Sequence, residues 1–402
     1  MSEMNQAPGV QYYLSVEIKG AKYNPVNIRY LVIKEWIFNI LPTIEICLID
    51  DGYLLEQVPL EDGEDINITL AKTEDDPNPI DLTFSFDDVE YGILGDNRKS
   101  IVTFTGHLKV DDMFTIKGRC FTKQNSASVL ENIAIEAWPL QFSNSHNIIP
   151  SDQMNWYQNS QTNFEFIKHI LRRSYIPNDT AFFYADIENN FIYTSLQSEI
   201  DKHNVKKAKF NVANYELNVK DDSDKDDTIW FTAYSIVNSS GYFNKMLTYG
   251  YEYNYYDLEN PIVKLYSDIN KLDSKVSFRN KSLVGKAVTR ISSIDYIASN
   301  LYGDKYYESL LRNKFLKDNF FANSLVLNIN ALSQVSLFDT IDIDIPSLFV
   351  ENGTNNVMSG LYLVNGIQHE VSVGGIYKKK LSLGRSGMRK SSIVKQYQVE
   401  EL

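Results

Sequence analysis

Apolar and polar residues alternate in five short segments within the first 120 residues. A period of two is typical of a β-strand with one buried face. Turn-forming clusters at 50–52, 61–63 and 74–79 separate the segments, and no helical pattern lies between them. The alternating positions are Tyr12, Leu14, Val16 and Ile18; Ile44, Ile46 and Leu48; Ile66, Ile68 and Leu70; Leu82, Phe84 and Phe86; and Val102 and Phe104. Strands at such short intervals predict a first β-barrel or sandwich over residues 1–125.

The pattern changes to helical spacing near Ser126. The stretch "SASVLENIAIEAW" has apolar residues on one helical face, at Val129, Leu130, Ile133 and Ala134. Farther on, the stretch "AFFYADIENNFIYTSL" has two apolar runs around Glu188-Asn189-Asn190, which predicts a hairpin. Residues 126–204 are therefore predicted to form an α+β middle domain.

A second helix is predicted inside "NWYQNSQTNFEFIKHILRRS", residues 155–174. Thr162 and Glu165 have the spacing of a capping box, in which each side chain binds the backbone N–H of the other residue. Positive charge at the end of the stretch suits the last helical turn. The predicted apolar face consists of Phe164, Ile167, Ile170 and Leu171, the basic end of Arg172 and Arg173, and Pro177 follows. His169 is predicted to flank the apolar face as a half-exposed residue without a catalytic role.

The remaining chain is predicted to be rich in β-structure. Residues 205–303 carry strand patterns, an acidic loop at 221–227 and a tyrosine-rich strand, and a helix is predicted around 304–317. Alternation returns at Ile341, Ile343 and Ile345 and continues through "GLYLVNGIQHEVSV" and "YKKKLSLGR". This pattern predicts a second β-barrel domain over 304–387, followed by a C-terminal tail at 388–402.

Two segments carry a faint internal repeat. "LEDGEDINITL" (60–70) and "LFDTIDIDI" (337–345) both run from Leu through an acid into an Ile-x-Ile strand. Two such short matches are a hint of duplication.

The net charge of −13 is unevenly distributed. Residues 377–399 contain no acid, so the rest of the chain sums to −20. Such an acidic body argues against a protein that grips nucleic-acid phosphates. The basic residues at the end favour a solvated, mobile terminus over a nucleic-acid contact; they are Lys378, Lys379, Lys380, Arg385, Arg389, Lys390 and Lys395. The chain has no signal-peptide pattern, no membrane-spanning run and only two distant cysteines, Cys47 and Cys120, so we expect a cytosolically made, soluble protein without a disulfide framework.

Motifs of catalysis or cofactor binding are not found in the sequence. Gly285-Lys286 lacks the rest of a Walker loop, and Gly384-Arg385-Ser386-Gly387 is one residue short of a nucleophile elbow and belongs to the basic tail. The five histidines, at 107, 146, 169, 203 and 369, do not have zinc-ligand spacing. We therefore predict a non-enzyme with no catalytic, cofactor-binding or metal-binding residues.

Two unusual stretches leave alternatives open. In the acidic loop, Asp222, Asp224 and Asp226 match the first calcium-ligand positions, but Asp227 replaces the required Gly and Ala233 the required Glu, which favours a solvated loop. In "YGYEYNYYDLENP", every second residue is aromatic, at Tyr249, Tyr251, Tyr253 and Tyr255. Such a face favours packing on a neighbouring domain or subunit, and the alternative is a stacking platform for sugar rings.

The capped-helix stretch resembles the central signature of the phage baseplate hub family, which includes the hub part of type VI secretion spike proteins with valine–glycine repeats. The matching positions are Gln158, Gln161, Thr162, Asn163, Phe164 and Phe166, with Gln161 where Glu is commoner, and the predicted hairpin follows. The segment "LFDTIDIDIPS…SGLYLVNGIQHEVSVGGIYKKKLSLGR" is similar to the closing barrel of that family. The matches occur in the family's order and cover most of the chain.

The resemblance implies a structural homotrimer in the tail baseplate of a virion, assembled in the cytoplasm of the host bacterium. Each chain would supply two tail-tube-like barrels, so that a pseudo-six-fold ring joins the tail tube, or a tube initiator, to a three-fold central spike and other baseplate proteins. DNA would pass through the channel without specific binding, which an acidic lumen would favour. The chain ends about seventeen residues after Arg385, so the spike is expected to be a separate polypeptide. The alternatives are a carbohydrate-binding or carbohydrate-cleaving baseplate component, and a hub of a type VI or extracellular contractile injection system.

Overall fold

The computed structural model describes residues 10–50, 64–137, 141–238 and 323–385, with gaps at 78, 95–98, 178, 189, 203–204, 211–227, 332, 348–352 and 356–357. It also describes the backbone of 251–257, 263–266 and 289–297, and single positions between 309 and 321. Strands dominate these residues, which confirms the prediction of a mainly β-fold with α+β insertions.

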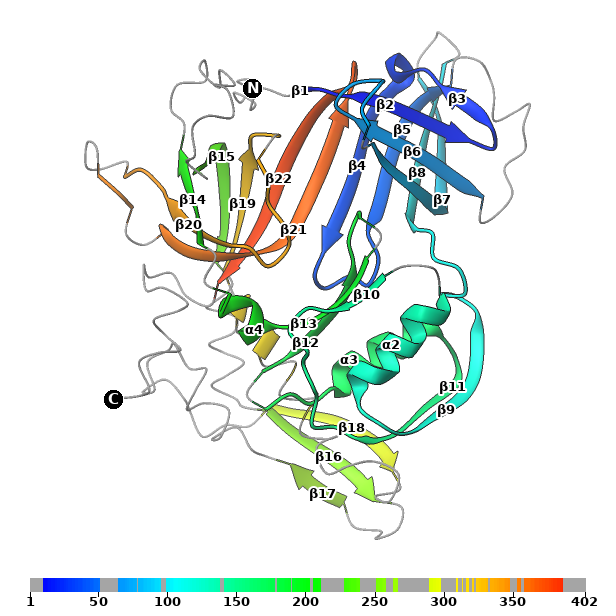
Figure 1. The fold of residues 1–402 in the computed structure, drawn as a ribbon, viewed down its shortest axis with the longest axis vertical. Coiled ribbons are helices and arrows are strands. Elements are labelled where there is room, and N and C mark those ends of the chain that lie inside the picture. Colours follow the sequence, from blue (N-terminus) through cyan, green and yellow to red (C-terminus); the bar gives the residue numbers. More distant parts are fainter. Residues whose placement is uncertain are drawn as a thin grey trace.

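Six strands close into a barrel on the upper left of Figure 1. In ring order they are β22 (Ile376–Arg385), β19 (Asn323–Ile329), β15 (Thr228–Asn238), β14 (Val205–Phe210), β20 (Thr340–Asp344) and β21 (Gly360–Ser372), and the β21–β22 pairing closes the ring. The predicted alternation at Ile341, Ile343 and Ile345 fills the interior, because all three side chains are buried in the barrel core. Two of these strands come from the predicted 205–303 segment and four from the predicted 304–387 segment.

A second sheet continues from the barrel, because β21 also pairs with β4. It contains, in order, β4 (Ile28–Trp36), β5 (Thr43–Asp50), β8 (Lys99–Leu108), β7 (Ile80–Leu94), β6 (Asp65–Ala71), β2 (Tyr13–Ile18) and β3 (Ala21–Tyr23). The sheet curls so that β2 and β3 cross in front of β4 and β5 in Figure 1. Within the described ranges, no pairing joins β3 back to β4, so this sheet is curled but open. At the other end, β1 (Val10–Gln11) pairs with β22, and a 3-10 turn, η1 (Pro25–Asn27), precedes β4.

The curled sheet shares one hydrophobic core with the helices and the hairpin of the middle region. The predicted alternating residues from Leu14 to Phe104 are all buried in this core. Tyr12, the first residue of the predicted pattern, is half-buried. Burial of large aliphatic and aromatic side chains contributes about 1.5–3 kcal/mol each. The two β-rich units therefore have separate hydrophobic cores but share one continuous run of strands.

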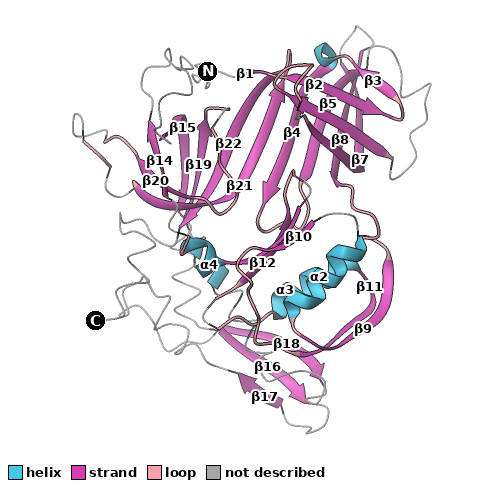
Figure 2. Ribbon diagram, in the orientation of Figure 1, coloured by secondary structure: helices cyan, strands magenta, loops and turns pink. Residues whose placement is uncertain are grey.

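The middle region lies below both sheets and contains the three α-helices shown in Figure 2. Its elements are β9 (Ile116–Gln124), α2 (Ser126–Ala137), β10 (Gln141–Asn144), β11 (Met154–Thr162), α3 (Asn163–Arg173), β12 (Ala181–Ala185), β13 (Asn190–Ser195) and α4 (Leu196–Ile200). The predicted apolar face of α2 is fully buried, and β12 and β13 form the predicted hairpin. Strand β10 joins this hairpin in parallel to β13, and β11 pairs with β9.

A small sheet of β16 (Tyr251–Asp257), β17 (Val263–Tyr266) and β18 (Thr289–Ile297) forms the bottom of Figure 1. Strand β16 is its central strand, paired with β17 on one side and β18 on the other. The predicted helix around 304–317 is consistent with five described helical positions, at Ser309, Asn313, Leu316, Lys317 and Phe320. No helix within the described residues is long and apolar enough to cross a membrane.

Candidate functional site

The start of α3 confirms the predicted capping box. The Thr162 hydroxyl accepts a hydrogen bond from the Glu165 backbone N–H at 3.1 Å, and the Glu165 carboxylate accepts one from the Thr162 N–H at 3.0 Å. The helix buries Phe166, Ile167 and Ile170 completely. The predicted apolar face is correct at Ile167 and Ile170 and differs at Phe164 and Leu171.

Phe164 and Leu171 were predicted to be buried, but both are half-buried and Phe166 takes the central place. The reason is that Phe164 packs at the edge of the helix. The centroid of its ring lies 5.2 Å from that of Phe114, and the Lys168 ammonium lies 4.0 Å from the centroid of the Phe164 ring. His169 is half-buried as predicted and stacks on Phe166.

The signature residues next to this cap form a buried polar network. The Gln158 side-chain oxygen accepts a hydrogen bond from Arg119 Nε at 2.8 Å, and its amide nitrogen donates to Asn163 Oδ1 at 3.0 Å. Asn163 is fully buried and also donates to the Asp112 carbonyl oxygen at 3.1 Å. Arg119 further contacts Glu136 on α2 as an ion pair. These contacts tie β9, β11, α2 and α3 together, so the signature carries a structural role in this chain.

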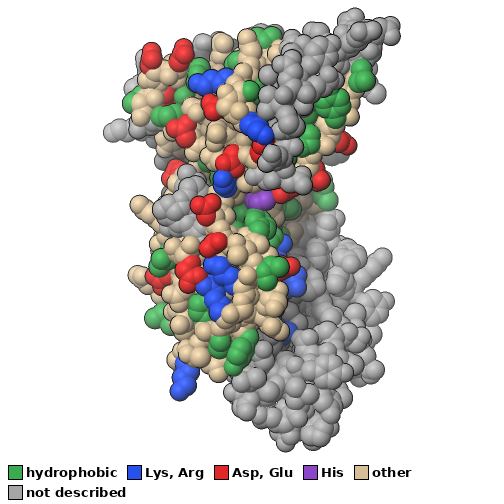
Figure 3. Space-filling view, turned by 90° about the vertical axis from the view of Figure 1, so that its right-hand side faces the viewer, with side chains coloured by type: hydrophobic (Ala, Val, Ile, Leu, Met, Phe, Trp, Pro, Cys, Tyr) green, Lys and Arg blue, Asp and Glu red, His purple; other side chains and the backbone are tan. Residues whose placement is uncertain are grey.

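A cleft of about 1370 Å³ separates the upper sheets from the middle region. Its walls come from β4, β6, β7, β21 and β22 above, from β10 and the β12–β13 turn below, and from the segment 333–337 that precedes β20. Figure 3 shows acidic and basic side chains side by side along the waist between these two parts. The cleft is a broad concave feature that borders the barrel, the curled sheet and the middle region.

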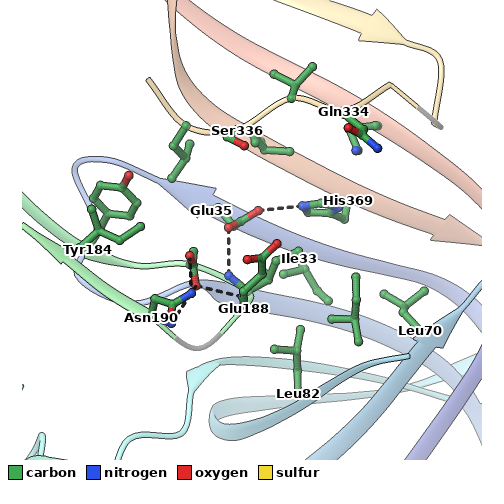
Figure 4. Close-up of a pocket in the computed structure, with 18 of the residues that line it drawn as sticks. Ile33, Glu35, Leu70, Leu82, Tyr184, Glu188, Asn190, Gln334, Ser336 and His369 are labelled. Atoms are coloured by element: carbon green, nitrogen blue, oxygen red, sulfur yellow. Dashed lines mark hydrogen bonds and ion pairs between the residues drawn. The ribbon is translucent and has the colours of Figure 1, made fainter. Parts of the chain in front are cut away.

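Three buried polar side chains meet at one wall of this cleft, and two of them, Glu35 and His369, are labelled in Figure 4. His369 Nε2 lies 2.8 Å from Glu35 Oε1, and His369 Nδ1 lies 2.6 Å from the Tyr377 hydroxyl. The other Glu35 oxygen accepts the Ile187 backbone N–H at 3.1 Å. The three residues are each at most 6% exposed. The Glu35–His369–Tyr377 cluster therefore connects β4, β21 and β22 with the turn of the β12–β13 hairpin.

The chemistry of the cluster is that of a structural link. Burial, together with the nearby Tyr12 and Glu35, raises the pKa of Tyr377, so its hydroxyl stays protonated and can donate to the imidazole. The two ring nitrogens of His369 face the Glu35 carboxylate and the Tyr377 hydroxyl, so the imidazole bridges β4 and β22 from its place on β21.

Other charged groups in the cleft are also engaged within the protein. Burial raises the pKa of Asp186, while hydrogen bonds from Asn190 and Glu188 oppose this shift. Burial lowers the pKa of Lys379, whose ammonium donates to the Ser333 carbonyl oxygen at 3.0 Å. The charges here hold the walls of the cleft together.

The cluster was not predicted from the sequence, although the sequence carries a signal for it. Glu35 follows Leu31 and Ile33 at a spacing of two on the buried face of β4, and His369 stands between Ile367 and Val371 on β21. A polar residue in phase with a buried apolar face needs a hydrogen-bonding partner. The partner itself could not be identified, because Glu35 and His369 are 334 positions apart.

The remaining described histidines and the two cysteines lie on different elements or turns. His107 pairs with Asp87 at 2.8 Å, and His146 lies 3.4 Å from Glu199, while His203 falls outside the described residues. Cys47 is buried, Cys120 is exposed, and both are free. In the described part of the chain, no three His, Cys, Asp or Glu side chains are close enough to hold a metal ion.

The basic terminal stretch requires a correction. Lys378, Lys379, Lys380 and Arg385 do not belong to a mobile terminus, because all four lie on β22 of the barrel. Leu381 and Leu383 on this strand are buried in the barrel core and fix its position.

Arg385 and Gly384 likewise end a barrel strand instead of lying in a tail. Arg385 is 2% exposed, donates to the Ser359 carbonyl oxygen at 3.0 Å and lies 4.2 Å above the Tyr362 ring. Residues 386–402 lie outside the described residues, and so do the acidic loop 221–227, Gly285-Lys286, Tyr249 and the side chains of Tyr251, Tyr253 and Tyr255. The sugar-platform alternative therefore stays a prediction.

The structure also has an exposed strand edge that was not predicted from the sequence. Strand β7 pairs with β6 only from Ile80 to Ser85, and from Asp88 to Leu94 its described pairing is with β8 alone. Its exposed apolar side chains, Val89, Tyr91 and Ile93, are 40%, 50% and 77% exposed. An open strand edge of this kind is a template for pairing with another chain.

This architecture is similar to that of two solved tail proteins. The chain superimposes on a tail protein from Neisseria meningitidis MC58 with a TM-score of 0.56 and 9% identity, over 95% of this chain and 99% of that one. A 43 kDa tail protein of prophage MuSo2 from Shewanella oneidensis gives a TM-score of 0.55 and 10% identity, over 93% and 98%. An Escherichia coli component of the type VI secretion system gives 0.48 and 9%, over 94% and 79%. No protein-family model and no curated protein matches the sequence.

The similarity to the two tail proteins spans nearly the whole of each chain, so it concerns the complete arrangement of barrel, curled sheet and middle region. The resemblance found in the sequence is thereby confirmed at the level of the fold.

Proposed function

We propose that this protein is a structural, non-enzymatic hub of a phage tail baseplate. The observation that carries the proposal is the end-to-end similarity of fold to two tail proteins, one from Neisseria meningitidis and one from a Shewanella prophage. It agrees with the hub signature at Gln158–Phe166 and with the closing-barrel pattern at 337–385, both found independently in the sequence. The hub would belong to the virion tail.

The proposed mechanism is symmetry adaptation by a homotrimer. Each chain has two β-rich units, the curled sheet within residues 1–125 and the closed barrel of β14, β15 and β19–β22, and β21 joins them through β4. Three chains would place six such units in a ring. That ring would match a six-fold tail tube on one rim and a three-fold spike on the other.

The proposed contacts between subunits use strand edges. The β7 edge from Asp88 to Leu94 offers both backbone groups and apolar side chains to a neighbouring chain. The acidic charge outside residues 377–399 would suit a channel that repels DNA phosphates. Tube, spike and other baseplate proteins are the proposed partners, and a hub of a related contractile injection system is the alternative with the same fold.

Electron microscopy of the chain co-expressed with candidate tube and spike proteins tests the adapter role. The expected class averages show a three-fold ring with six similar lobes, bound to the spike on one rim. Variants Val89→Lys and Ile93→Lys on the β7 edge should reduce the fraction of rings, whereas Glu131→Lys on exposed α2 should not change it. If no mixture contains ring-shaped particles, the adapter role is rejected.

A further inference from the structure

Strand β10 presents a free backbone edge to the cleft. Within the described residues β10 pairs only with β13, so it is the outer strand of the three-stranded sheet β10-β13-β12. Gln141, Phe142 and Ser143 all line the cleft. Because successive side chains of a strand point to opposite faces, three successive residues line a cavity only when the strand turns its edge toward it.

The opposite wall offers apolar groups. Ile33, Leu70 and Leu82 line the cavity from β4, β6 and β7 in Figure 4 but are at most 5% exposed, so most of the exposed apolar surface of this wall comes from Ile80, which is 37% exposed. A pocket for a small molecule has a volume of about 300–1,000 Å³, and the cleft is larger than that range. Its size and its two unlike walls suit a stretch of several residues better than a compact ligand.

Acidic groups dominate the end of the cleft at the β12–β13 turn. Asp186 and Glu188 both line it, and Glu188 is exposed. Asp186 accepts N–H groups from Glu188 and Asn190. Three lysines line the cleft: Lys202 is paired with Glu199, Lys379 donates to the Ser333 carbonyl oxygen, and Lys72 follows the end of β6, away from this turn in the sequence. A basic side chain of an occupant would therefore find complementary charge at this end.

We propose that the cleft binds an extended, basic polypeptide segment of a partner protein, which adds to the free edge of β10 as a fourth strand. Main-chain hydrogen bonds to β10 supply affinity, as in other cases of strand addition. Alternate side chains contact the Ile33, Leu70, Leu82 and Ile80 wall, and a Lys or Arg lies against Asp186 and Glu188. The binding site lies within one chain, so it does not depend on the trimeric ring.

A library of random 12-residue peptides displayed on phage provides the probe. Peptides selected on the purified chain are then synthesised with a fluorescent label, and their Kd is measured by anisotropy, with a scrambled peptide as reference. The expected sequences alternate apolar residues and carry Lys or Arg. Hydrogen exchange of the backbone amides at 141–144 should slow when such a peptide is bound, which side-chain contact alone would not cause.

Three variants test whether the peptide binds in the cleft. Ser143→Trp fills the cleft at the exposed edge of β10 and should weaken binding at least tenfold. Glu188→Lys reverses a charge and should weaken binding of the basic peptides at least threefold. Glu131→Lys, a matched charge reversal on the exposed face of α2, should leave the Kd unchanged. Circular dichroism and native mass, which should equal those of the parent chain, establish that each variant is folded.

The proposal is overturned if no selected peptide binds better than its scrambled form. It is also overturned if folded Ser143→Trp binds as tightly as the parent chain, or if bound peptide leaves exchange at 141–144 unchanged. Ring formation by the same variants separates the two proposals: rings without peptide binding would reject only the cleft, and peptide binding without rings would reject only the hub.

Discussion

Replacing His369 with Ala should lower the local free energy of unfolding of the sheets around β4 and β21 by about 3–5 kcal/mol. The substitution removes the only side chain that bonds both Glu35 and Tyr377 in the described cluster, and it leaves the buried Glu35 carboxylate with the Ile187 N–H but without its imidazole partner. Removing one member of a buried pair is costly because the remaining charge stays buried without compensation. Native-state hydrogen exchange of the β4, β21 and β22 amides measures this loss without requiring the whole chain to unfold in one step.

His107→Ala is the matched control for His369→Ala. His107 pairs with Asp87, whose side chain is 53% exposed, so this pair is screened by solvent and should contribute less than about 1 kcal/mol. Glu35→Gln keeps the size of the side chain and its hydrogen-bonding capacity, and should be milder than His369→Ala. Equal losses for His107→Ala and His369→Ala would contradict a role for the cluster in joining the barrel to the hairpin.

Replacing Gly106 with Ala should destabilise the curled sheet by about 3 kcal/mol, at the upper end of the usual cost of overpacking. Gly106 lies on β8 between Ile44 of β5 and Phe86 of β7, beside the irregularity between Phe86 and Asp88. A Cβ there would stand 2.3 Å from the Ser85 carbonyl oxygen and 2.9 Å from the Phe86 Cα. Both are backbone atoms, so the strands themselves would have to move apart.

Gly92→Ala on the neighbouring strand β7 is the matched control for Gly106→Ala. A Cβ at Gly92 would meet nothing within 4 Å, so this change should alter stability by less than about 1 kcal/mol. Hydrogen exchange of the β5, β7 and β8 amides, or denaturation followed by tryptophan fluorescence, measures the two variants side by side. A Gly106→Ala protein as stable as Gly92→Ala would show that the spacing of β7 and β8 is less constrained than the structure indicates.

Local periodicity was sufficient to predict many of the strands and both long helices. Strands β2, β5, β6, β7, β8 and β20 follow clean alternation, and α2 and α3 follow helical spacing with a capping box. Strand β4 was not predicted, because Leu31, Val32 and Ile33 are consecutive apolar residues that hide its period of two. Strand β11 was not predicted either, because its buried Gln158 is held by polar bonds to Arg119 and Asn163.

Long-range contacts could not be read from local patterns. The barrel closes because β14 lies parallel between β15 and β20, a pairing that joins segments on both sides of the small β16–β18 sheet in the sequence. The cleft likewise combines the Asp186–Asn190 turn with Ile33, Leu82 and His369 from distant segments. The hub resemblance supplied the order of the domains, but the polar contacts that hold them became visible only in three dimensions.

The native mass of the purified chain, measured by light scattering alone and after co-expression with a spike protein that itself trimerises, decides whether this protein is a trimeric hub. The hub proposal predicts a species of three times the 46.2 kDa of one chain in at least one of the two conditions. A chain that stays monomeric in both conditions would contradict it.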